Sequence, residues 1–123
     1  MSEGVRRIRP NERTEGPATA GMIREEAVAT DGTWAGFVRT APGMTSGWHH
    51  HGRFESVIYV DTGALLMEFG PGGREALEAG PGDFVYVAPG AVHRERNPTD
   101  VESNIIVVRS GSGEAVINVD APQ

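Results

Sequence analysis

The apolar residues of this chain occur mostly in short runs, and clusters of glycine, proline, asparagine or aspartate separate one run from the next. Residues 80–82 (Gly-Pro-Gly) and 97–100 (Asn-Pro-Thr-Asp) are the clearest breaks, and 71–73 (Pro-Gly-Gly) indicates another tight turn. Glycine permits the positive φ angles that such turns need. Many short strands with frequent turns favour a sandwich or a small barrel. The sequence therefore predicts an all-β fold of about ten short antiparallel strands.

The length and the distribution of polar residues predict one domain with an N-terminal extension. With 123 residues, the chain can bury a single hydrophobic core. Residues 1–20 are polar and are interrupted by Pro10, Gly16 and Pro17. We therefore predict an arm over 1–20 and the folded barrel domain over 21–123. Within the arm, 5–9 is predicted either as an edge strand or as a loose segment.

Composition excludes several classes of function. The formal net charge of −6 argues against nucleic acid as a partner, because phosphates require a basic surface. The chain has no cysteine, which excludes disulfides, thiolate metal sites and cysteine nucleophiles. All eleven basic residues are arginine, so Schiff-base chemistry through lysine is excluded as well. We find neither a signal peptide nor a run of about 20 apolar residues, and expect a cytoplasmic protein without a membrane partner.

All four histidines lie in two short glycine-bounded segments, with His49, His50 and His51 in one and His93 in the other. Imidazole is the commonest metal ligand in proteins. On a strand, residues i and i+2 point to the same face, so His49 and His51 would share a face while His50 points away. This layout predicts a metal held inside the β-structure.

The spacing around these histidines resembles the two motifs of the cupin superfamily. The first motif places five residues between Gly43 and His49-x-His51, three more before Glu55, and Gly63 at the end of the strand. The second motif consists of Gly82, Gly90, His93 and Asn97 at the family spacing. Together they span residues 43–97, a little under half of the chain.

This resemblance implies a single-domain jelly-roll β-barrel with a metal at its mouth. The implied ligands are His49, His51, Glu55 and His93. The ion would be a divalent transition metal, and Fe, Mn, Ni, Cu and Zn are all consistent with these ligands.

Two departures from the family pattern concern the carboxylate and a turn. Seven residues rather than six separate Glu55 from Gly63, so that counting back six from Gly63 reaches Ser56. A one-residue slip on a strand moves a side chain to the other face. Either a bulge lets Glu55 reach inward, or the site has three histidines and water in place of the carboxylate. We predict Glu55 as the ligand. Ala88 also stands where the family usually has proline, beside Pro89.

The resemblance also implies a class of function. We expect a metal-dependent enzyme, dioxygenase-like or isomerase- or decarboxylase-like, that acts on a small oxygenated organic molecule in the barrel. The motifs assign no catalytic residue. The alternative is a non-catalytic protein in which the metal anchors a small molecule for binding or sensing. Relatives of this kind commonly form homodimers that exchange terminal strands, for which the arm and residues 115–119 are the candidates.

Candidate substrate contacts come from side chains near the predicted site. Arg39 ends an apolar strand just before the metal motif and could bind a substrate carboxylate if it faces inward. Arg109 follows another apolar run, and it could likewise either bind a substrate carboxylate or lie on the surface. Tyr59, Tyr86 and Phe69 are the aromatic candidates for lining the pocket. The sequence Arg94-Glu95-Arg96 is interpreted as a solvated strand face.

Overall fold

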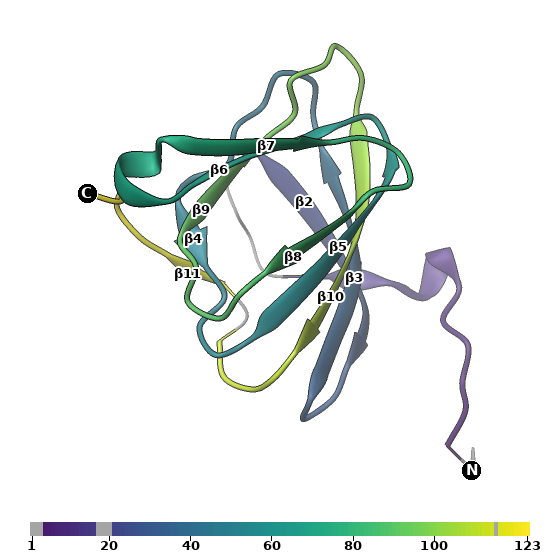
Figure 1. The fold of residues 1–123 in the computed structure, drawn as a ribbon. Helices are drawn as coiled ribbons and strands as arrows, with labels where there is room; N and C mark the ends of the chain where they lie inside the picture. The colour runs from purple at the N-terminus through teal and green to yellow at the C-terminus, as the bar shows by residue number, and fades with distance from the viewer. Residues whose placement is uncertain (1–3, 17–20, 115) are drawn as a thin grey trace.

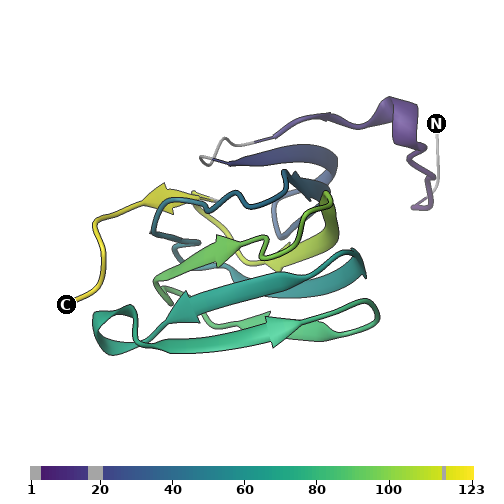
Figure 2. The same ribbon diagram turned by 90° about the horizontal axis from the view of Figure 1, so that it is seen from above.

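A computed structural model describes residues 4–16, 21–114 and 116–123, and shows two antiparallel sheets wrapped around a common interior (Figure 1 and Figure 2). The prediction of an all-β jelly-roll fold is confirmed. Its described part contains eleven strands, close to the number expected. In spatial order, the six-stranded sheet consists of β1 (Thr14–Glu15), β2 (Met22–Ala29), β3 (Thr33–Thr40), β10 (Ser103–Ser110), β5 (Glu55–Thr62) and β8 (Phe84–Val87). The five-stranded sheet consists of β11 (Ile117–Asn118), β4 (His49–His50), β9 (His93–Arg96), β6 (Leu65–Phe69) and β7 (Glu75–Ala79).

Helical structure in the described residues is confined to two short 3₁₀ segments, η1 (Pro10–Glu12) and η2 (Pro71–Gly73). Neither is long and apolar enough to cross a membrane.

Side chains alternate between the two faces along each strand, so the inward-facing residues of adjacent strands form rows across the sheet. In β10, residues 103, 105, 107 and 109 are buried, whereas 106, 108 and 110 are exposed. Because neighbouring strands are in register, inward residues of adjacent strands lie side by side. One row of the six-stranded sheet consists of Arg24, Val38, Ile105 and Val60, and the next includes Val107, Ile58 and Val85.

The third inward row of this sheet contains polar residues. Trp34 of β3, Arg109 of β10, Ser56 of β5 and Val87 of β8 are cross-strand neighbours in that order. In the opposite sheet, the corresponding row contains His49 of β4 and His93 of β9. The chain passes directly from Val87 at the end of β8 through one short turn to His93 at the start of β9. Both polar rows therefore lie at the same end of the barrel.

The N-terminal arm is partly integrated into the barrel. Residues 5–9 form no strand, and this segment extends away from the barrel (Figure 1). Thr14 and Glu15 pair with Glu26 and Glu25 of β2, which makes β1 an edge strand of the six-stranded sheet. The predicted boundary at residue 20 lies outside the described residues, as does Ala115. Further along the C-terminal segment, β11 pairs with β4 of the same chain.

Candidate metal centre

Three histidines converge inside the barrel, as the sequence predicts. His49 and His93 are directly opposed on β4 and β9, and His51 follows β4. One ring nitrogen of each histidine lies within 4.8 Å of those of the other two. All three side chains are buried, whereas His50 points away and its Nδ1 accepts a hydrogen bond from the Gly52 amide at 3.0 Å. The predicted grouping of His49, His51 and His93 is confirmed.

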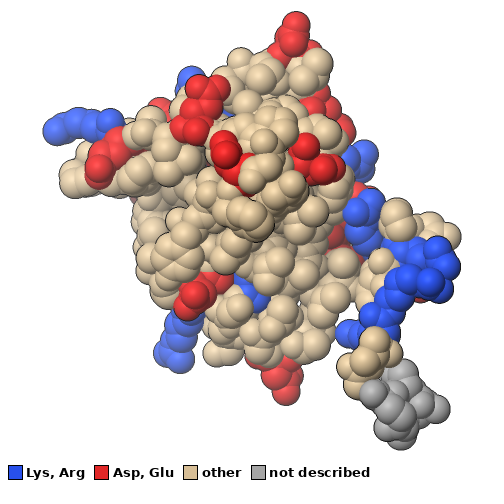
Figure 3. All heavy atoms as spheres, turned by 45° about the vertical axis from the view of Figure 1, so that its right-hand side comes forward, with Lys and Arg blue, Asp and Glu red and all other residues tan. Residues whose placement is uncertain are grey.

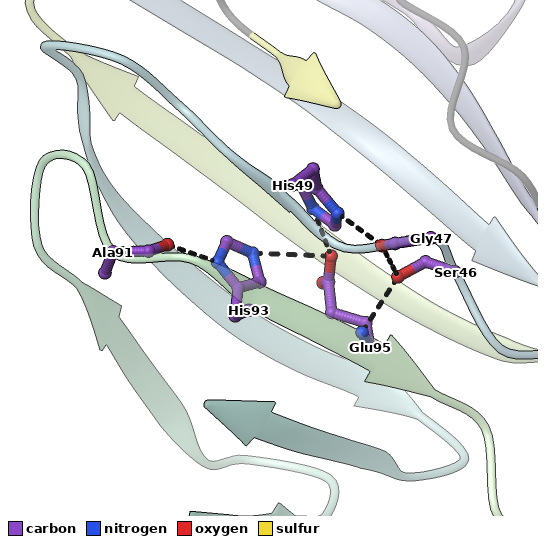
Figure 4. Close-up of polar contacts among 6 residues, drawn as sticks. All are labelled: Ser46, Gly47, His49, Ala91, His93 and Glu95. Carbon is purple, nitrogen blue, oxygen red and sulfur yellow. Dashed lines mark hydrogen bonds and ion pairs between the residues drawn. The ribbon is translucent and has the colours of Figure 1, made fainter. Parts of the chain in front are cut away.

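Backbone carbonyls fix the protonation of two of these rings. Nδ1 of His49 lies 2.9 Å from the Gly47 carbonyl oxygen, and Nδ1 of His93 lies 2.8 Å from that of Ala91 (Figure 4). A carbonyl oxygen only accepts, so each neutral ring carries its hydrogen on Nδ1. Nε2 is then left with a lone pair directed into the barrel. Metal-binding histidines are typically oriented in this way.

A buried carboxylate that the sequence analysis missed contacts two of the three histidines. Oε2 of Glu95 lies 3.1 Å from Nε2 of His49 and 3.8 Å from Nε2 of His93. The Glu95 amide donates to Ser46 Oγ, which in turn donates to the Gly47 carbonyl that also accepts from His49 (Figure 4). This chain of hydrogen bonds ties the backbone of β9 to the His49 ring.

The alternation rule that grouped His49 with His51 also identifies Glu95. Glu95 follows His93 by two residues on β9, and both are buried. Arg94, between them, points out of the barrel and donates to Glu68 at 2.9 Å. The interpretation of 94–96 as a solvated face was therefore wrong for Glu95, because one strand presents its residues to two different environments.

Charge and burial lower the pKa of Glu95 and of His93, respectively, which suits the binding of a cation. Burial on its own would raise the pKa of Glu95, but the contact with His49 and the charges of His93 and Arg24 outweigh it and hold this pKa below its usual range. Burial lowers the pKa of His93, with Glu95 opposing that effect. An ionised carboxylate beside neutral imidazoles is the state in which these groups bind metals.

The structure does not bring Glu55, the predicted fourth ligand, to the histidines. Glu55 is exposed at the start of β5, and the buried residue beside it is Ser56. The register between β5 and β10 is continuous here and shifts only between Val60 and Thr62. The additional residue of the first motif is thus accommodated by an irregularity at Asp61, near Gly63, and no bulge turns Glu55 inward.

The candidate substrate contacts divide into two groups. Arg39 lies on the outside, where its Nε is 3.8 Å from a Glu25 carboxylate oxygen, and Tyr59 packs against Phe84 on the outer face. Phe69 and Tyr86, by contrast, line a cavity of about 100 Å³ that reaches His93. The other walls of this cavity come from Met67, Leu77, Val87, Ala88 and Ala91. It is therefore an apolar approach to the cluster.

Comparison with known proteins places this arrangement in context. A family model described as Cupin domain matches residues 36–109, which include all three histidines and Glu95. No curated protein matches the sequence.

Solved structures with a similar fold share little sequence with this chain. A protein with a double-stranded β-helix domain from Klebsiella pneumoniae is 19% identical, with a TM-score of 0.72 over 85% of this chain and 90% of that one. KdgF from Halomonas sp. is 22% identical, with a TM-score of 0.70 over 84% and 92%. The polyketide cyclase RemF from Streptomyces resistomycificus is 18% identical, with a TM-score of 0.76 over 97% and 88%. At these identities the comparisons establish the shared fold.

Proposed function

The chain belongs to the cupin domain family, and on that basis we propose that it binds one divalent transition metal and uses it to act on a small oxygenated organic molecule. The proposed ligands are His49, His51 and His93, with Glu95 in place of Glu55 as the carboxylate. The observation that carries this proposal is the contact between Glu95 and His49. Because Nδ1 of His49 carries the hydrogen, two acceptor atoms face each other at 3.1 Å. Such a pair is stable only with a proton or a metal cation between them.

The donor set determines which ions fit and what they supply. Three imidazole nitrogens and one carboxylate oxygen suit Fe(II), Mn(II), Ni(II), Cu(II) and Zn(II). Bound there, such an ion would act as a Lewis acid toward a carbonyl or enolate oxygen, or lower the pKa of bound water. Glu95 itself is a poor general base, because its pKa is held low. Its role fits charge compensation of the cation.

The surrounding residues favour a small substrate with an apolar part. Phe69 and Tyr86 line the cavity that leads to His93. Its volume is about 100 Å³, whereas typical ligand pockets have volumes of about 300 Å³ or more. Dioxygenase-like and isomerase- or decarboxylase-like chemistry both remain consistent with such a site. One related structure is by name a polyketide cyclase, which supports an enzyme of the second kind.

The same small cavity favours a second candidate, a non-catalytic protein in which the metal anchors a bound molecule. The two candidates differ in turnover. The Fe(II)-loaded enzyme is expected to consume dioxygen or transform a member of a panel of diketones, phenols and keto acids. Tight binding without turnover under any of the five metals would identify the binding protein.

Elemental analysis tests the metal site itself. We expect about one equivalent of metal per chain in the wild type and in His50→Ala, whose side chain points away from the cluster. The His51→Ala, His93→Ala double variant is expected to retain less than a tenth of that amount. Equal metal content in all three proteins would disprove the site.

We also propose that the protein is a homodimer formed through the outer face of the six-stranded sheet. Large apolar side chains are exposed there on three adjacent strands: Phe84 (70%), Tyr86 (60%), Val57 (40%), Ile106 (40%) and Val108 (39%). Contiguous exposed apolar surface of this kind is typical of protein interfaces. In Figure 3, a broad area without charged side chains occupies much of the middle of the view.

The opposite charges of the arm and of the whole chain support a second copy of this chain as the partner. The described part of the arm, residues 4–16, carries four arginines and two glutamates, whereas the whole chain has a net charge of −6. The arm also extends away from its own barrel (Figure 1). Light scattering is expected to give about 26 kDa, twice the chain mass of 13.1 kDa. Val108→Glu should shift this mass toward the monomer, whereas Val101→Glu, exposed outside the strands, should not. A wild-type mass near that of one chain would contradict the dimer.

A further inference from the structure

The polar row of the six-stranded sheet contains an arginine that is buried without a counterion. Arg109 is 1% exposed, and its guanidinium stacks over the Trp34 ring with 4.6 Å between the Cζ atom and the ring centroid. No carboxylate of the described residues lies within ion-pair distance of it, and its Nε and Nη1 have no hydrogen-bond partner. Burial lowers the pKa of Arg109 to about 10. The fold thus keeps a guanidinium where its charge is poorly solvated.

Ser56, the cross-strand neighbour of Arg109, has an unused polar atom as well. Its side chain is 1% exposed, and its Oγ has no hydrogen-bond partner. Leaving a buried polar group unsatisfied costs about 1–3 kcal/mol, so native proteins rarely do so without a reason. Two adjacent inward side chains with three such atoms indicate a missing polar ligand.

The balance of buried charge identifies the sign of that ligand. Arg109 is a buried cation, and no carboxylate of the described residues lies within ion-pair distance of it. A divalent cation at the histidines would add further positive charge to the same end of the barrel. Uncompensated charge in a low-dielectric interior is strongly unfavourable, so this end of the barrel requires an anion.

We propose that Arg109 and Ser56 form an anion subsite beside the metal, and that the molecule bound in the barrel is a small carboxylic acid. This proposal rests on the proposed function and specifies its substrate class. The carboxylate would accept hydrogen bonds from Nε and Nη1 of Arg109 and from Ser56 Oγ. The rest of the molecule would occupy the apolar cavity, whose lining includes Val87, the neighbour of Ser56, as well as His93. The volume of about 100 Å³ limits this part to a few heavy atoms.

Calorimetric titration of zinc-loaded protein tests the subsite with matched pairs of probes. Acetate, lactate and malonate are compared with acetamide, lactamide and malonamide at constant ionic strength. At least one carboxylate is expected to bind the wild type ten times more tightly than its amide. Arg109→Met should weaken this binding at least tenfold and Ser56→Ala about threefold, whereas Arg39→Met, which removes an outward-facing arginine, should leave it unchanged. Zinc content should be the same in all four proteins.

Two results would overturn the proposal: no carboxylate binds the wild type better than its amide, or Arg109→Met binds as the wild type does. A failure of the metal site is distinguishable, because it appears as zinc missing from the wild type. The metal-free protein still tests the subsite in that case, since Arg109 stays buried with Nε and Nη1 unpaired. Its melting temperature should rise with carboxylate and not with amide. If Arg109→Met does not fold, Arg109→Lys should bind the carboxylate with intermediate affinity, and unchanged affinity would refute the role of the guanidinium.

Discussion

Replacing Glu95 by glutamine separates the carboxylate shown by the structure from the one implied by the sequence motif. Glu95→Gln keeps the shape of the side chain and an oxygen that can bind a metal, but removes the charge. Glu55→Gln makes the same chemical change at an exposed position at the start of β5. If Glu95 supports the metal, only the first variant should lose metal affinity.

The magnitude follows from the geometry of the cluster. Two ligand atoms about 2.1 Å from one metal lie about 3.0–3.4 Å apart at angles between about 90° and 109°. The 3.1 Å between Oε2 of Glu95 and Nε2 of His49 falls within this range, whereas the 3.8 Å to Nε2 of His93 is longer. Loss of a supporting carboxylate typically weakens metal binding 10- to 100-fold. This corresponds to about 1.4–2.7 kcal/mol for Glu95→Gln, with less than a twofold change for Glu55→Gln.

The assay is competition between the protein and a chromophoric chelator for zinc, with an unfolding curve recorded for each sample. The unfolding curve is needed because Glu95 is buried in contact with His49, so that Glu95→Gln can change the stability of the fold as well as the affinity for zinc. Affinity is therefore compared at a temperature where every variant is folded. Weaker zinc binding by Glu55→Gln, with Glu95→Gln unchanged, would refute this account of the site.

Three further outcomes are expected. Gly82 has φ +93° and open space around it, so Gly82→Ala should lower the free energy of unfolding by about 1–2 kcal/mol. In Gly63→Ala the new Cβ would lie 2.5 Å from Ser103 Oγ, so the decrease should be about 2–5 kcal/mol. Equal decreases for the two variants in thermal unfolding would show that the clash with Ser103 adds nothing. The Nδ2 of buried Asn97 contacts three backbone carbonyl oxygens, so Asn97→Ala should cost about 2–4 kcal/mol in urea unfolding, and a loss below about 0.5 kcal/mol would contradict this. Because burial lowers the pKa of His93, the folded metal-free protein binds fewer protons than the unfolded chain, and its stability should fall as the pH drops below about 6.5. The melting temperature is measured against pH for the wild type and for His93→Gln. The same dependence on pH in both proteins would contradict this role of His93.

The fold and three of the site residues were predictable because each depends on local sequence. Turn residues and strand alternation determine the short strands, and the spacing His49-x-His51 places both rings on one side of the chain. The prediction of His93 as part of the same site came from the fixed spacing of residues in the second motif.

The carboxylate was not predictable from the motif spacing, because the position of a strand irregularity depends on pairing between distant segments. The additional residue in β5 is accommodated opposite β10, near Asp61, and this decides that Ser56 rather than Glu55 faces inward. Strand alternation could have predicted that Glu95 faces inward with His93, but its position between two arginines suggested a solvated face. The choice of Arg109 rather than Arg39 as the inward arginine likewise depends on strand register, which the composition of an apolar run does not determine.

An anomalous-difference map of metal-loaded crystals, recorded at the absorption edge of the bound metal, tests the central claim most directly. We expect a single peak about 2.0–2.3 Å from a ring nitrogen of His49, His51 and His93 and from one carboxylate oxygen of Glu95. A peak that lies away from the three rings, or that has Glu55 rather than Glu95 as its carboxylate ligand, would contradict it.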